Sequence, residues 1–113
     1  MVGGDASKVH FDCYLRSLGD LSHAKTIRMI RSGLVDADLD SLLKLLSGYP
    51  SVETLIVTNN RLSEQSVLAL RNFKQRNPNS KLEQVYFGNN FIKGNKTSGA
   101  ARTLEKRGVA VYL

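Results

Sequence analysis

One stretch decides the fold of this chain: Val52-Glu-Thr-Leu-Ile-Val-Thr-Asn-Asn-Arg-Leu62. Its apolar residues stand at spacings of three, two and five, and Asn60 comes two residues before the last of them. The same frame returns 30 residues later in Leu82-Glu-Gln-Val-Tyr-Phe-Gly-Asn-Asn-Phe-Ile92, and a weaker copy lies 28 residues upstream at Ala24, Ile27, Met29, Ser32 and Leu34. Self-similarity at a fixed period of this length is typical of stacked repeats, in which each copy packs on its neighbours.

Each copy contains a short strand and a turn whose chemistry can be predicted from the residues. Residues 55–57 are apolar, and Ile56 and Val57 are β-branched, which indicates a strand whose side chains point alternately to opposite sides. A buried turn after the strand leaves backbone groups in need of partners, and an asparagine side chain has both donors and an acceptor. We expect stacked copies to place Asn60 above Asn90, with Ser32 as a poorer substitute in the first copy.

The frame L-x-x-L-x-L-x-x-N-x-L, over roughly residues 24 to 113, resembles that of leucine-rich repeat proteins, and its long period is similar to the ribonuclease-inhibitor-like class. The resemblance implies an α/β, right-handed solenoid with a parallel sheet on its concave side and short helices on its convex side. The right-handed connection between parallel strands favours the same arrangement. Proteins of this fold are mostly binding scaffolds, and the fold itself does not identify a partner.

The whole chain divides into a loose terminus, a cap and alternating strands and helices. Residues 1–8 are Gly-rich and polar and are predicted to be a flexible N-terminus, whereas residues 9–113 form a single domain. Residues 9–23 are too few for a full repeat and are interpreted as an N-terminal cap, because an end repeat exposes apolar faces. Repeats begin at about residues 24, 52 and 82, with strands expected at 27–30, 55–57, 85–87 and 109–113.

A helix is predicted on each connection between strands. The first has apolar residues at helical spacing, namely Leu39, Leu42, Leu43 and Leu46. The predicted helix caps are Asp36 or Asp38, Ser63, and Thr97 or Ser98. In the last helix we expect Ala101 and Leu104 to face inward.

The chain has 113 residues and a formal net charge of +6, which is unevenly distributed. Residues 1–60 hold six Lys/Arg and seven Asp/Glu, a net of −1, whereas residues 61–113 hold ten Lys/Arg and three Asp/Glu, a net of +7. Such a field favours acidic partners, nucleic acid or an anionic surface.

The lone Cys13 excludes an internal disulfide. We expect an intracellular, cytoplasmic location without a membrane span, because no leader or long apolar run is seen.

Three stretches resemble chemical sites but depart from the required spacing. Residues 88–97 lie where a phosphate-binding loop would, yet five residues instead of four separate the glycines. Residues 36–40 carry alternating aspartates, but Ser47 stands where a calcium loop needs glutamate. His10 and Cys13 are at most half of a zinc site, and a pair alone is insufficient for covalent chemistry. We therefore predict no catalytic residues, no cofactor and no metal.

The better candidate is the sheet face that points away from the helices. One row of outward residues is expected to contain Arg28, Ile56, Tyr86 and Ala110, and the next Ile30, Thr58, Gly88 and Tyr112, with Arg31, Asn59 and Asn89 at the edge. Tyr and Arg are over-represented among binding hot spots, although outward strand positions favour aromatic and β-branched residues in any case. The residues hypothesised to bind a protein partner are Arg28, Ile30, Arg31, Ile56, Thr58, Tyr86 and Tyr112.

A second candidate surface is a basic patch in the C-terminal half. Its members are Arg71, Lys74, Arg76, Lys93, Lys96, Arg102, Lys106 and Arg107. A solvated helical face would have the same composition. If the patch is functional, it would contact nucleic acid or an acidic protein or lipid surface mainly by electrostatics, because no clustered aromatic residues accompany it.

These observations favour a non-catalytic protein–protein interaction module, with a basic adaptor for nucleic acid or an anionic surface as the alternative. A GTPase-activating repeat protein is a third class by analogy of fold, but no catalytic arginine can be singled out. The final strand, 109–113, is expected to have an unpaired edge. Membership of a longer repeat chain, an edge-to-edge homodimer and a partner at this edge are the three explanations that remain open.

Overall fold

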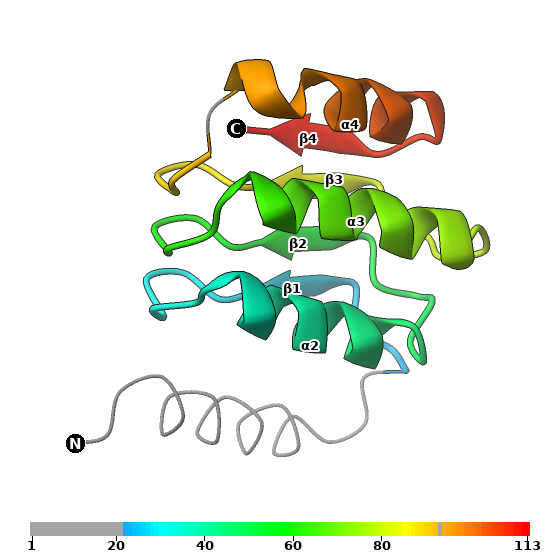
Figure 1. Ribbon diagram of the computed structural model, residues 1–113. Coiled ribbons are helices and arrows are strands. Elements are labelled where there is room, and N and C mark those ends of the chain that lie inside the picture. Colours follow the sequence, from blue (N-terminus) through cyan, green and yellow to red (C-terminus); the bar gives the residue numbers. More distant parts are fainter. Residues whose placement is uncertain (1–21, 93) are drawn as a thin grey trace.

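Figure 1 shows the protein as a computed structural model, which describes residues 22–92 and 94–113. For residues 94–98 only the backbone is described. The predicted flexible terminus at 1–8 and nearly all of the predicted cap at 9–23, with His10 and Cys13, lie outside the described residues.

Strands and helices alternate strictly along the described chain. The elements are β1 (Thr26–Arg28), α2 (Asp36–Leu46), β2 (Thr54–Ile56), α3 (Glu64–Arg76), β3 (Gln84–Tyr86), α4 (Gly94–Lys106) and β4 (Ala110–Tyr112). The strands form one parallel sheet in the order β1-β2-β3-β4, and the three helices all lie on the same side of it in Figure 1. The prediction of an α/β fold with a parallel sheet is therefore confirmed.

Three strands begin one residue earlier than predicted, because hydrogen bonding begins earlier than the apolar pattern suggested. The backbone N–H of Thr54 already donates to the Lys25 carbonyl, 3.0 Å away, so β2 includes Thr54. Its last expected residue, Val57, is still bonded to the Tyr86 carbonyl at 3.0 Å but lies outside the strand proper. β1 and β3 begin one residue early in the same way.

The register of β4 corrects the predicted rows. Tyr112, and not Ala110, stands beside Tyr86, while Ala110 pairs with Gln84. The reason is that Val109 belongs to the turn before the strand: it is fully buried, and its N–H donates to the Leu104 carbonyl at 2.8 Å. Both tyrosines therefore lie in one row.

The core fills the space between the sheet and the helices. The leucine stripe of α2 is buried as predicted, and so are the inward strand residues Ile27, Leu55 and Val85. α4 corrects two expectations: it begins at Gly94 instead of at the predicted caps near residues 97–98, and Ala100, not Ala101, joins Leu104 in the core.

Asn60 connects two successive turns through five side-chain hydrogen bonds. Its Oδ1 accepts from the N–H groups of Ser32 and Leu34, at 2.9 and 3.1 Å. Its Nδ2 donates to three carbonyls, those of Met29, Val57 and Thr58. The side chain thus supplies the partners that the buried turn needs.

Asn90 repeats this arrangement one copy further on. Its Oδ1 accepts from the Leu62 N–H at 2.9 Å, and its Nδ2 donates to the carbonyls of Phe87 and Val57. Ser32, at the corresponding place in the first copy, contributes only a 3.3 Å bond from its hydroxyl to the Ile30 carbonyl. A hydroxyl is too short and has too few donors to replace the amide.

Asp36 forms a second link between copies that the sequence analysis did not predict. It does not cap its own helix, where Asp38 accepts from the Val35 N–H at 3.0 Å. Instead, its carboxylate accepts from the Ser63 N–H at 2.8 Å and from the hydroxyls of Ser63 and Ser66 at the start of α3. Burial raises the pKa of Asp36, but the hydrogen bonds from both serines outweigh that effect and lower it below its ordinary value.

Candidate partner-binding face

The side of the sheet opposite the three helices is the candidate site, and we call it the open face. Its central row follows directly from the strand register and consists of Arg28, Ile56, Tyr86 and Tyr112. These side chains alternate with the buried residues of the same strands, so they point away from the core. None of the described helices lies over this face (Figure 1).

Two tyrosines form a stacked pair at one end of the central row. The ring centroids of Tyr86 and Tyr112 are 4.5 Å apart, and the ring planes differ by 10°. Tyr112 is 46% exposed, whereas Tyr86 is half-buried and its hydroxyl donates to Gln84 Oε1 at 3.4 Å. The pair is a preformed aromatic surface whose side chains have already lost much of their freedom before any partner arrives.

The neighbouring positions leave this aromatic surface accessible. Ile30, Thr58 and Gly88 follow the central row along their strands, and Ile30 is 42% exposed. A Cβ atom at Gly88 would meet only the Thr58 methyl group, at 3.7 Å. Gly88 therefore adds no side chain next to Tyr86, although an alanine would fit there.

The edge of the open face is made by residues with left-handed backbone. Arg31, Asn59 and Asn89 have φ angles of 53°, 59° and 58°. The Asn89 Nδ2 donates to Asn59 Oδ1 at 2.9 Å, which makes a second, exposed amide ladder beside the buried one. The sequence analysis placed these residues at the edge but did not foresee the ladder, although the doubled Asn-Asn in two copies was its signal.

Two exposed arginines add charge to this surface. Arg28 is exposed at the β1 end of the central row, and Arg31 is exposed at the edge, so both guanidinium groups are available to a partner. Phe91, in the turn after β3, is 68% exposed, and the sequence analysis did not single it out because it occupies a variable place between Asn90 and Ile92. The open face therefore offers apolar and aromatic contacts with cations at one end.

The predicted basic patch is less uniform than its composition suggested. Lys74 is only 7% exposed, and its ammonium donates to the Ser80 carbonyl, so it does not belong to a solvated face. Arg102, Lys106 and Arg107 are exposed, and Arg71 is half-buried. The side chains of Lys93 and Lys96 lie outside the described residues.

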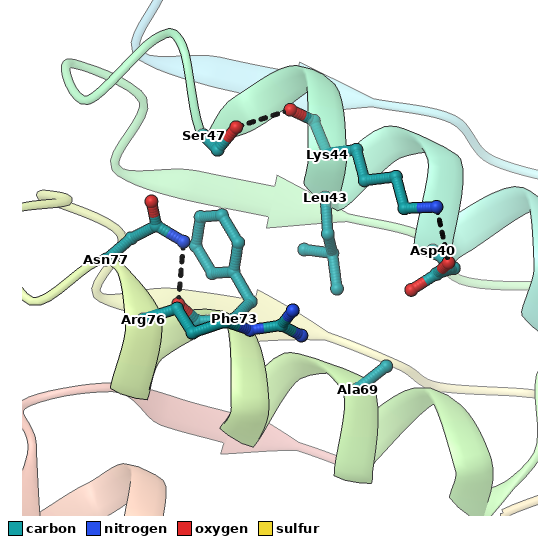
Figure 2. A pocket seen from close by; sticks show the side chains of 8 residues that line it. All are labelled: Asp40, Leu43, Lys44, Ser47, Ala69, Phe73, Arg76 and Asn77. Carbon is teal, nitrogen blue, oxygen red and sulfur yellow. Dashed lines mark hydrogen bonds and ion pairs between the residues drawn. The ribbon is translucent and has the colours of Figure 1, made fainter.

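Arg76 is exposed and belongs to a different surface, the groove between α2 and α3. This groove has a volume of 410 Å³ and is lined by Asp40, Leu43, Lys44, Ser47, Ala69, Phe73, Arg76 and Asn77. Figure 2 shows Leu43 and Phe73 approaching each other from the facing helices, while Lys44 pairs with Asp40 at 3.5 Å. Its apolar floor is buried core, and Lys44 at its rim already has a partner.

Within residues 22–92 and 94–113, no three His, Cys, Asp or Glu side chains come together in a way that could hold a metal ion. In the same part of the chain, no helix is long and apolar enough to cross a membrane.

Comparison with known proteins adds no assignment. A scan against protein-family models and a search of curated proteins both return no match.

Proposed function

We propose that this chain is a non-catalytic protein-interaction module of the leucine-rich repeat type, a right-handed solenoid with the open face on its concave side. Support comes from the repeated strand–turn–helix unit, with its helices on one side of a parallel sheet. Asn60 and Asn90, which connect successive turns, support the same interpretation.

The observation that carries the binding proposal is the stacked pair of Tyr86 and Tyr112 on a face that no described helix covers. Aromatic residues that lose little conformational freedom on binding are favoured as anchors of protein interfaces. Ile56 lies beside Tyr86 in the same row and extends the apolar surface. A partner would place apolar side chains against these residues.

Charge gives the proposed partner an orientation. Arg28 stands next to Ile56 at the opposite end of the row from Tyr112, and Arg31 lies on the same copy. Adjacent strands are about 4.8 Å apart, so Arg28 lies roughly 14 Å from Tyr112 across the sheet. The partner segment would therefore carry a carboxylate over β1 and apolar groups over β2 to β4.

The test compares proteins captured by three versions of the intact chain: wild type, the double variant Ile56→Ala/Tyr86→Ala, and the control Arg76→Ala on the helix side. Capture is carried out from lysate at moderate and at high salt, after circular dichroism has shown equal folding. A protein retained at high salt by wild type and control, but lost by the double variant, supports the proposal. Equal retention by all three versions rejects the open face as the binding site.

A basic adaptor is the second candidate, because residues 61–113 hold a net charge of +7. Binding that disappears at high salt and is indifferent to Ile56 and Tyr86 would favour it.

A further inference from the structure

β4 forms an outer edge of the described sheet. It stands at one end of the strand order and, among the described strands, pairs with β3 alone. The Ala110 N–H donates to the Glu83 carbonyl at 2.8 Å, and the Tyr112 carbonyl accepts from the Phe87 N–H at 2.7 Å. Ala110 and Tyr112 therefore turn their backbone groups towards β3.

The alternate residues of β4 turn their backbone groups to the other side. The peptide bonds are trans, so each carbonyl points in the opposite direction to the N–H of the next residue. The Val109 carbonyl and the Leu113 N–H consequently point away from β3, and so do both backbone groups of Val111, which lies between Ala110 and Tyr112. We call these backbone groups of Val109, Val111 and Leu113 the β4 edge. The Val109 N–H is not part of it, because it donates to the Leu104 carbonyl at 2.8 Å.

The donors and acceptors of the β4 edge are complementary to those of a second copy. In an antiparallel pair, two residues directly opposite each other can exchange both N–H···O bonds. If Val111 lies opposite Val111 of the second copy, both of its backbone groups are paired. The Leu113 N–H of each copy then meets the Val109 carbonyl of the other. Every group of the β4 edge finds a partner, and the Val109 N–H, which this register leaves over, is already bonded within its own chain.

The side chains of β4 permit this pairing. The same register places the small, half-buried Ala110 opposite the large Tyr112 of the second copy, which is 46% exposed. Leu113, at 47% exposure, would be covered by the second strand. Sheet edges are commonly protected from pairing by charged residues or proline, but residues 109–113 contain neither. The β4 edge therefore lacks the usual barrier to strand pairing.

We propose that the β4 edge is a homodimer interface, at which two copies of this chain pair antiparallel about Val111. The occupant is a second copy because the edge supplies its own complement in a single register. A contact limited to one strand pair is smaller than the ~1,200–2,000 Å² of stable protein interfaces, so the dimer is weak and reversible. The inference does not rest on the function proposed for the open face, because it needs no other protein.

The experiment measures the mass of the intact chain by sedimentation over an about hundredfold range of concentration, since small interfaces dissociate on dilution. Leu113→Pro is the test variant and Leu113→Ala its matched control. Both lose the same exposed side chain, but only proline removes the N–H that would bond to Val109 of the second copy. Proline also favours the extended backbone that Tyr112 already has in β4, and circular dichroism checks that both variants fold.

We expect a concentration-dependent dimer in wild type, with a dissociation constant at least about tenfold higher in Leu113→Pro than in Leu113→Ala. A wild-type chain that stays monomeric over the whole range overturns the proposal and leaves the β4 edge to a strand of another protein. Equal dissociation constants in the two variants also overturn it, because the dimer would then not depend on backbone pairing.

The register is tested by NMR on a mixture of labelled and unlabelled chains. Residues opposite each other without mutual hydrogen bonds have Cα atoms about 4.5 Å apart, so an intermolecular contact is expected between the Hα atoms of Ala110 and Tyr112. A dimer whose intermolecular contacts lie outside β4 contradicts the proposal.

Discussion

Asn59 and Asn60 are neighbours in the chain, yet their side chains differ in exposure and in hydrogen bonding. Asn89 and Asn90 show the same difference one copy later. Asn60 is 6% exposed and makes five side-chain hydrogen bonds to buried or partly buried backbone groups. Asn59 has a left-handed φ of 59° and shares one bond with Asn89 at the surface. The same residue type thus holds the fold together in one row and shapes an accessible edge in the next. The two asparagines differ in their access to water. Backbone groups bonded to Asn60 are shielded and have no water as an alternative partner, whereas water can replace the bond between Asn59 and Asn89.

The sheet shows the same contrast along each strand. Leu55 and Val85 are fully buried under the helices, whereas Ile56 and Tyr86 face the other way and remain partly accessible. Changes on the buried side should therefore reduce stability, and changes on the open face should reduce binding with little effect on stability.

The largest effect is expected from Asn60→Ala. The substitution leaves the N–H groups of Ser32 and Leu34 without their acceptor. It also removes a donor from three carbonyls, of which only that of Val57 keeps a second side-chain donor, Asn90 Nδ2. We expect a loss of about 3–5 kcal/mol in the free energy of unfolding. Chemical denaturation would measure this, with Asn59→Ala as the control. Equal losses of unfolding free energy in the two variants would show that Asn60 contributes no more to stability than Asn59 does.

Tyr86→Ala and Tyr112→Ala should weaken partner binding by about 2 kcal/mol each, roughly thirtyfold, while stability changes less. The two rings should be coupled by about 0.5–1.5 kcal/mol in a double-mutant cycle of stability, because they stack at 4.5 Å. Isothermal titration with the captured partner and denaturation would give both numbers. A loss of stability larger than the loss of binding would mean that the pair is structural.

Asp36 should make stability depend on pH. Its pKa in the folded protein lies below the ordinary value of 3.8, so its contribution is fully present above that value and is lost as the pH falls through the folded pKa. Asp36→Asn should cost roughly 1–2 kcal/mol at neutral pH, because the serine hydrogen bonds to a charged acceptor are lost. The difference between wild type and variant should shrink below about pH 4. A difference that is constant from pH 7 to pH 3 would contradict the assignment.

The smallest effect is expected from Asn59→Gly. Glycine adopts the left-handed conformation without strain, but it loses the bond to Asn89 and gains entropy in the unfolded chain. These terms nearly cancel, so we expect a change within about 0.5 kcal/mol of wild type. Destabilisation of more than about 1.5 kcal/mol would place the exposed ladder among the structural contacts.

The parts predicted well from the sequence are those that repeat. The frame around Asn60 and Asn90 indicated the strands, and the leucine stripe indicated α2. The row partner of Tyr86 was predicted wrongly because the last copy has no asparagine frame to align it. Lys74 was assigned to the basic patch because a charged residue type does not reveal that its side chain is buried and that its ammonium donates to the Ser80 carbonyl.

By itself, the sequence determined the alternation of strands and helices, since apolar periodicity is a local property that each segment carries alone. It also determined which residues could satisfy the buried turns, because asparagine has the necessary donors and acceptor. Only the tertiary structure decided that Tyr112 stacks on Tyr86 and that Asp36 reaches the start of α3. Each of these contacts joins residues 26 or more positions apart, and their meeting depends on the register between copies, which no single segment specifies.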